Sequence, residues 1–383
     1  MESILHLLFL LQFLPLLSSS ESYDPQVKYF MNCGSKDSKL VDLRNFVGDE
    51  NSNPSFSVGK SNSVQNENPL PGILPLYHTA RIYTKISHYM LNITQTGSYL
   101  IRLHFFPFSF KKNHLADAVF NVLASNFSLL SNFSVGNNST EFPVIKEFFL
   151  KIDEGNFDIY FIPADETRFA FVNAIEAFLL PPKFFIDNLT AIPPLRTIDA
   201  ALRTLYRINV GGPEVKDTLW RNWVPDNDYL TFGSSEQAPC NGEPKEARQR
   251  LVVKEIAPDD VYRTCKTVSI VNGSSNIPNI TWRFNVSKEA RHLVRLHVCD
   301  FFSPSPDDSG YMSFSIAPNK MSIKKVAFLN GLEIMEFVGN STFEVPVEHE
   351  TRKHIDLKIG LAGEGGLPVR QLKGLKIPPL LPI

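Results

Sequence analysis

One strand-like segment occurs twice in this chain of 383 residues, and its repetition limits the fold more than any other feature. Leu100-Ile-Arg-Leu-His-Phe-Phe106 recurs as Leu293-Val-Arg-Leu-His-Val-Cys299. The preceding segments match as Thr79-Ala-Arg81 and Thr264-Cys-Lys266, and the closing ones as Val172-Asn-Ala-Ile-Glu-Ala177 and Leu372-Lys-Gly-Leu-Lys-Ile377. A period near half the chain length predicts two copies of one domain, not a solenoid of short units.

Apolar and polar residues alternate along several segments with a period of two. Such segments are Phe157 to Phe161, Ile280 to Val286 and Val294 to Val298. Strands of this kind bury one face, which is typical of antiparallel sheets packed as sandwiches. We therefore expect an all-β protein with two tandem antiparallel β-sandwich domains, in which Asn285 faces solvent.

Local patterns also predict turns and one helix. Asn272-Gly273 and Asn330-Gly331 are strong hairpin-turn signals. Gly211-Gly212 and Gly363 to Gly366 predict turns and not phosphate-binding loops, because no helix-opening pattern follows them. Thr197 to Leu205 is the best candidate for a short helix.

The ends of the chain suggest export. Ile4 to Leu17 is almost wholly apolar and Ser18 to Ser20 supplies small residues, so residues 1–20 predict a secretory signal peptide. No later segment has the 18 or so apolar residues needed to span a bilayer. We expect a chain that is secreted to the extracellular space; the family resemblance described below further implies the cell-wall space. The expected division is domain A at 21–180, a stiff Pro-rich connector at 181–203, domain B at 204–378 and a tail at 379–383.

The connector is short, so it should hold the domains in one relative orientation. The cleft between them is then the natural binding region.

Glycosylation sequons are dense, as expected for a secretory route. Asn-x-Ser/Thr occurs at Asn92, Asn126, Asn132, Asn137, Asn138, Asn188, Asn272, Asn279, Asn285 and Asn340. The chain also has four cysteines, which allow three pairings if all of them bond. Cys240 and Cys265 fall in the same repeat and are the pairing we favour. Cys33 and Cys299 either bond between the repeats or remain buried thiols.

Composition and spacing argue against several function classes. The formal net charge of −2 disfavours nucleic acid and anionic membranes as partners. His292 and His297 have an odd spacing that places them on opposite faces of a strand, so we expect no metal site and no cofactor. Asp259-Asp260 and Asp307-Asp308 are sequence neighbours, which favours surface loops over a facing catalytic pair. The chain should not be an enzyme.

The repeated Arg-x-His pair has two structural interpretations. Arg102 with His104, and Arg295 with His297, either lie on a solvated sheet face or form a structural network that both repeats share. Descent from a duplicated strand explains both pairs without a functional role.

The chain resembles the paired malectin-like ectodomain of plant receptor-like kinases of the FERONIA and THESEUS kind. The motifs that carry the resemblance are Asn32-Cys-Gly-Ser35, Tyr77 to Tyr83, Val144 to Phe148, Phe171 to Glu176, Tyr206 to Gly212, Ala257 to Tyr262 and Leu293 to His297. Members of that family are anchored in the plasma membrane and continue into a cytoplasmic kinase. This sequence contains no Gly-rich loop, catalytic Lys or His-Arg-Asp segment of a kinase.

The resemblance also implies ligands. Its partners would be rapid-alkalinisation-type secreted peptides with a lipid-anchored coreceptor, or cell-wall polysaccharide. Animal malectin holds sugars partly through a Tyr-Phe pair, whose place is taken here by Ser109-Phe110 and Phe302-Ser303. Phe110 and Phe302 are therefore the candidate carbohydrate-binding residues.

We expect a non-catalytic binding protein, with a soluble decoy as the sharpest hypothesis. The alternatives are a cell-wall lectin, and a truncated gene model of a membrane receptor-like Ser/Thr kinase. A carbohydrate-active enzyme ranks last.

Overall fold

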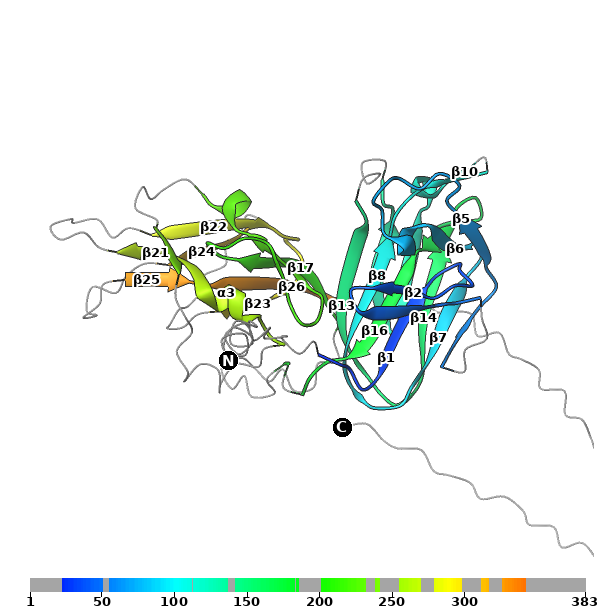
Figure 1. Cartoon of the computed structure of the whole chain (residues 1–383), viewed down its shortest axis with the longest axis horizontal. Coiled ribbons are helices and arrows are strands. Elements are labelled where there is room, and N and C mark those ends of the chain that lie inside the picture. Colours follow the sequence, from blue (N-terminus) through cyan, green and yellow to red (C-terminus); the bar gives the residue numbers. More distant parts are fainter. Residues whose placement is uncertain are drawn as a thin grey trace, which may run out of the picture. The chain divides into compact units, whose positions relative to one another are not determined.

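The computed structural model describes residues 23–50, 55–111, 113–136, 142–182, 184–185, 201–231, 238–241, 255–269, 279–297, 311–316 and 326–341. Strands dominate these ranges (Figure 1). The only helical segments in them are η1 (Pro75–Tyr77), η2 (Leu115–Asp117), η3 (Asn227–Tyr229) and α3 (Asp259–Arg263). All described residues belong to one compact unit of the chain.

The first repeat consists of strands β1 to β16. They are β1 (Lys28–Asn32), β2 (Lys39–Val41), β3 (Arg44–Gly48), β4 (Phe56–Val58), β5 (Asn62–Gln65), β6 (Thr79–Tyr83), β7 (Ser87–Ile93), β8 (Gly97–Phe105), β9 (Ser109–Phe110), β10 (Asn113–His114), β11 (Phe120–Ala124), β12 (Phe127–Phe133), β13 (Val144–Ile152), β14 (Gly155–Pro163), β15 (Ala170–Val172) and β16 (Ala174–Leu179).

The second repeat consists of strands β17 to β26. They are β17 (Ala201–Asn209), β18 (Val215–Lys216), β19 (Asn222–Pro225), β20 (Ala238–Asn241), β21 (Thr264–Ser269), β22 (Ile280–Asn285), β23 (His292–His297), β24 (Tyr311–Ile316), β25 (Val326–Leu329) and β26 (Gly331–Val338).

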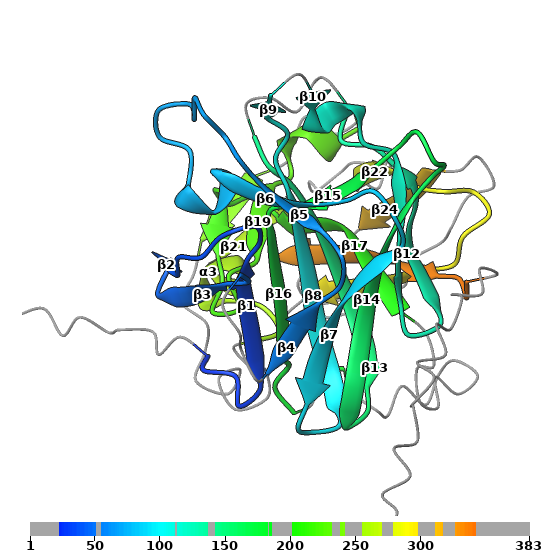
Figure 2. The same cartoon turned by 90° about the vertical axis from the view of Figure 1, so that its right-hand side faces the viewer.

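One sheet runs through both repeats. Its order is β18-β19-β17-β13-β8-β16-β1-β3-β2, and β26 pairs with both β17 and β23. Figure 2 shows β13, β8, β16 and β1 side by side in this order. The repeats join where Phe148 and Phe149 of β13 pair with Arg203 and Leu202 of β17. The second layer of the first repeat is the sheet β12-β11-β14-β7-β4.

Equivalent strands make equivalent pairings in the two repeats. β1 pairs antiparallel with β16 and parallel with β3. β17 does the same with β26 and β19. These two parallel pairs depart from the purely antiparallel sheets that alternation predicts. The duplication inferred from one strand therefore extends to the strands that pair with β1 and with β17.

Two of the three alternating segments bury the face that their pattern predicts, whereas in β23 Val294 and Leu296 are half-buried and His297 is the buried residue. In β22, Trp282 and Phe284 are buried while Asn285 is exposed, and in β14 Phe157, Ile159 and Phe161 are buried. The main hydrophobic core lies in the first repeat and also takes in Leu219 and Met335 from the second. A smaller core around Trp282 and Ile334 fills the second repeat.

Some local predictions were wrong. Ala201 to Leu205 form part of β17 and not a helix, because pairing with β13 and β26 overrides local propensity. Asp259 and Asp260 lie in the first turn of α3 and not in a loop. Asn330-Gly331 joins β25 to β26, which belong to different sheets, so it is no hairpin turn.

Gly211 lies in the turn that its sequence predicts, with a positive φ of 71°. Thr197 to Ala200, Asn272-Gly273, Asp307-Asp308 and Gly363 to Gly366 lie outside the described residues.

The closing match of the repeats was also wrong. Glu176 of β16 pairs with Arg102 of β8, and Glu333 of β26 pairs with Arg295 of β23. The counterpart of the Asn173-to-Glu176 segment is therefore Asn330 to Glu333. Residues 372–377, which the sequence comparison had matched to it, lie outside the described residues.

Candidate functional site

A buried cluster centred on His104 lies on the main sheet of the first repeat. The His104 Nε2 atom is 2.8 Å from Glu176 Oε1, and its Nδ1 atom is 2.9 Å from the Tyr77 hydroxyl. Because an ionised carboxylate only accepts, a neutral His104 donates from Nε2 to Glu176 and accepts at Nδ1 from Tyr77. Arg102 donates to the other oxygen of Glu176 at 2.9 Å.

The second repeat contains the same cluster. His297 Nε2 lies 3.3 Å from Glu333 Oε2, and His297 Nδ1 lies 3.0 Å from the Tyr262 hydroxyl. Arg295 donates to Glu333 at 2.9 Å. His104 and His297 are 5% and 3% exposed. The Arg-x-His pairs thus form a shared structural network and not a solvated face.

The ionisation states of these groups fit a structural role better than a role in proton transfer. Burial lowers the pKa of both histidines, although their carboxylate partners act in the opposite direction. Burial would raise the pKa of Glu176 and Glu333, but the surrounding arginines and histidines outweigh it and hold both values well below the ordinary range. Neutral histidines therefore face ionised carboxylates at neutral pH.

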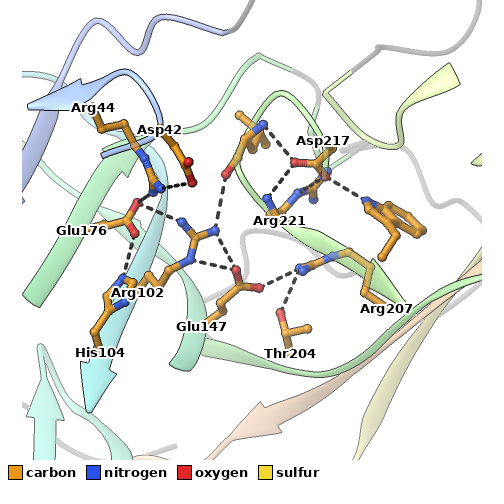
Figure 3. Close-up of polar contacts among 12 residues, drawn as sticks. Asp42, Arg44, Arg102, His104, Glu147, Glu176, Thr204, Arg207, Asp217 and Arg221 are labelled. Atoms are coloured by element: carbon orange, nitrogen blue, oxygen red, sulfur yellow. Dashed lines mark hydrogen bonds and ion pairs between the residues drawn. The ribbon is translucent and has the colours of Figure 1, made fainter. Parts of the chain in front are cut away.

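Glu147 links the networks of the two repeats (Figure 3). It lies on β13 and accepts from Arg102 of the first repeat at 2.7 Å and from Arg207 of the second at 2.8 Å. These two arginines outweigh the opposing effect of burial and lower its pKa to about 2. Arg102 also donates to the backbone oxygen of Leu219 in the second repeat at 3.4 Å.

A loop of the second repeat completes this junction. Arg221 is fully buried and pairs with Asp217 at 2.7 Å and with Glu333 at 3.7 Å. The guanidinium groups of Arg221 and Arg295 each lie 5.0 Å from the centre of the Phe184 ring. Arg221, Glu176 and Glu333 are buried, so side chains fill the junction at these residues, and the cleft that the connector had suggested stays a prediction.

A second repeated motif is built around a buried aspartate. Asp49 accepts from the backbone N–H of Gly34 and from Arg81, and Asp226 accepts from Gly211 and from Lys266. Both glycines have a φ of 71°, and a Cβ atom there would lie 2.2 or 2.3 Å from a backbone oxygen. Only glycine fits this close approach between neighbouring strands.

The predicted glycan acceptors fall on exposed positions wherever they are described. These are Asn92, Asn126, Asn132, Asn279, Asn285 and Asn340. Asn137, Asn138, Asn188 and Asn272 lie outside the described residues. The exposed positions are accessible to a glycosyltransferase, and glycosylation itself stays a prediction.

The structure describes only some of the candidate sugar-binding residues and cysteines. Phe110 is half-buried in the β9–β10 hairpin and contacts Phe169 edge-on, with ring centroids 6.4 Å apart. Phe302 lies outside the described residues. Cys265 is disulfide-bonded and its backbone pairs directly with that of Cys240, whereas Cys33 is a buried free thiol. Cys299 also lies outside the described residues.

Sequence reasoning missed several members of the junction. Tyr77 and Tyr262 each precede a matched threonine by two positions, a spacing that could have revealed them. Glu333 was missed because Leu372 to Ile377 had been matched instead. Glu147 and Arg207 lie within two of the motifs that carry the family resemblance, but no sequence signal showed that they pair across the repeats.

The model of the malectin-like domain family matches residues 31–359. This chain belongs to the malectin-like domain family. Two curated relatives come from Arabidopsis thaliana. A probable receptor-like protein kinase is 33% identical over 391 residues, covering 87% of this chain and 47% of the relative. Receptor-like protein kinase THESEUS 1 is 29% identical, covering 90% of this chain and 41% of the relative.

Solved ectodomain structures match this malectin-like chain over most of their own length. The plant receptor-like kinase FER has a TM-score of 0.66 at 24% identity, covering 82% of this chain and 97% of the other. A structure of the plant peptide RALF23 with FER and LLG2 has a TM-score of 0.67 at 25% identity and covers 96% of the matched chain.

The malectin-like chain spans less than half of the length of these curated relatives. It corresponds to their ectodomains and not to their kinase domains. Within the described part of the chain, no helix combines the length and apolar character needed to cross a membrane.

Proposed function

We propose that this malectin-like chain is a non-catalytic, extracellular binding module for a secreted peptide of the RALF23 kind. The observation that supports this most is its likeness to the FER chain whose structure contains RALF23 and LLG2. By the same likeness, a protein of the LLG2 kind would bind with the peptide. The module would be secreted and glycosylated at the exposed sequons.

The buried charges support binding rather than catalysis. The junction carboxylates Glu147, Glu176 and Glu333 are each held by at least two cationic or imidazole groups of the chain itself. Carboxylates that are paired with cationic groups in this way keep their protonation states when a ligand binds elsewhere. Recognition would then use the exposed loops and sheet edges.

Calorimetry on the purified glycoprotein tests this function. A synthetic RALF23-type peptide is titrated into the chain alone and into the chain mixed with an LLG2-type protein, with a scrambled peptide as control. We expect saturable heat with the authentic peptide, enhanced by the LLG2-type protein. Identical heats for authentic and scrambled peptide in both titrations would contradict the proposal.

A soluble form of the module would act as a decoy. It would compete with membrane-anchored relatives for the same peptide. Adding the purified protein to plant tissue should then reduce the response to that peptide, and an unchanged dose–response curve would argue against competition.

Cell-wall polysaccharide is the second candidate ligand. Phe110 supports it, because a half-buried ring on a short hairpin can stack on a sugar face. Titration with oligogalacturonides should then produce heat that Phe110→Ala removes, while peptide binding persists. Absence of heat with every oligosaccharide would leave the peptide as the ligand.

A further inference from the structure

The β11–β12 hairpin of the first repeat contacts the second repeat just after the end of β26. Phe127, the first residue of β12, forms an isolated antiparallel bridge with Asn340. Two backbone hydrogen bonds flank this bridge, from the Ser128 N–H to the Gly339 oxygen at 3.2 Å and from the Ser341 N–H to the Asn126 oxygen at 2.6 Å. The repeats therefore also meet through a short strand pair.

The positions of these hydrogen bonds fix how the two bridged side chains lie. In an antiparallel pair, opposite residues that are flanked by hydrogen bonds but exchange none have Cα atoms about 4.5 Å apart, and their side chains are the closest in the ladder. Phe127 and Asn340 are such a pair. The Asn340 side chain of the second repeat thus lies beside the Phe127 side chain of the first.

Both residues have the chemistry for a contact with a sugar. Asn340 is exposed and begins the glycosylation sequon Asn340-Ser341-Thr342. Phe127 is half-buried, so it packs against the main hydrophobic core and leaves part of its ring accessible. An aromatic ring can stack on the apolar face of a pyranose. The pyranose closest to Phe127 would be the one that is bonded to Asn340.

We propose that the first N-acetylglucosamine of a glycan on Asn340 stacks on Phe127 and so links the two repeats. The second repeat supplies the covalent attachment, and the first supplies the aromatic surface. The sugar covers ring surface that would otherwise contact water, which stabilises the strand pair between the repeats. The inference rests on the glycosylation that forms part of the proposed function, but not on which ligand the module binds.

The sequon at Asn92 supplies the matched control. Asn92 is exposed on β7, and its register partner on β14 is Asn156, which is also exposed. Both strands belong to the first repeat. A sugar on Asn92 therefore has no aromatic residue directly opposite it and does not start at a junction between the repeats.

Urea unfolding of the glycoprotein tests the contact, after an endoglycosidase has trimmed each glycan to its first N-acetylglucosamine. Mass spectrometry of the trimmed protein measures which asparagines carry that sugar. Asn340→Gln should lower the folding equilibrium constant about fivefold, equivalent to about 1 kcal/mol, whereas Asn92→Gln should change it less than about twofold. In a Phe127→Leu background, which keeps an apolar side chain without a ring, Asn340→Gln should have no such effect.

Thr342→Ala removes the sequon and keeps both bridged residues, so it should reproduce the effect of Asn340→Gln. An Asn340 that carries no sugar would overturn the proposal. So would an effect of Asn340→Gln that persists undiminished in the Phe127→Leu background. Calorimetry with the peptide is a separate measurement, so a chain that fails to bind peptide can still show the sugar contact, and the reverse also holds.

Discussion

At the scale of single residues, the junction contains buried charges that are stable only because partners of opposite charge surround them. Glu176 is fully buried and accepts from Arg44, Arg102 and His104. Removing one partner from such a buried set typically costs 3–5 kcal/mol, because it leaves an uncompensated charge. The histidines are the members of this set whose ordinary pKa lies near the physiological range.

Mild acid should destabilise the fold through these histidines. Burial places the pKa of His104 and His297 below the ordinary value of 6.5, so the unfolded chain binds more protons just below that pH. Stability is then complete above about pH 6.5 and falls as the pH drops toward the folded-state values. Urea unfolding at pH 7.5 and 5.5 measures the difference.

His104→Gln and His297→Gln should each remove part of that pH dependence. Equal free energies of unfolding at both pH values in the unsubstituted chain would contradict the assignment.

At the scale of elements, hairpins and strand pairs set what each repeat can contact. The β18–β19 hairpin is anchored by Asp217, which accepts from Arg221 and from the indole N–H of Trp223. The β20–β21 pair is anchored differently, because Cys265 is disulfide-bonded and lies opposite Cys240. Direct cross-strand partners have the closest side chains in an antiparallel pair, which supports a bond between these two cysteines.

The proposed Cys240–Cys265 bond should stabilise the second repeat. In the chain-entropy model a loop of this size contributes about 3 kcal/mol, so Cys265→Ser should lower the free energy of unfolding by about that amount. Mass spectrometry of a non-reduced digest should recover the two cysteines in one linked peptide. A linked peptide that instead joins Cys265 to Cys299 would show that the assignment is wrong.

At the scale of the whole molecule, the repeats are coupled by strand pairing and by buried charge. β13 and β17 make the sheet continuous, and Glu147 binds an arginine from each repeat. A second ion pair between the repeats joins Lys216 to Asp42, but both side chains are more than 40% exposed. Solvent weakens that pair, whereas the buried one should couple the repeats.

A double-mutant cycle measures this coupling. Glu147→Gln and Arg207→Met should interact by about 1–3 kcal/mol in the free energy of unfolding, because the two groups meet in a buried network. The matched cycle of Asp42→Ala and Lys216→Ala should yield less than about 1 kcal/mol. Equal coupling energies in the two cycles would show that burial does not distinguish these pairs.

The fold class and the duplication could be predicted from the sequence, and the details of the site could not. Period-two alternation is local, so the buried faces of β14 and β22 followed from it. The repeated strand drew attention to the Arg-x-His pairs, but it left open whether their side chains face solvent or form a buried network. Closing the second repeat at residue 372 was wrong, because Asn173 and Glu176 recur as Asn330 and Glu333 and place the closing segment there.

The amino-acid sequence by itself determined two related sandwiches, because side-chain periodicity and repetition are properties of the chain. The tertiary structure alone decided which charges meet at Glu147, since residues 60 positions apart come together only through the pairing of β13 with β17. It also decided that the tip of the β18–β19 hairpin is buried while the tip of the β2–β3 hairpin is exposed. That difference arises because the second repeat docks Leu219 and Trp220 onto the first, whereas Leu43 at the other tip is 83% exposed.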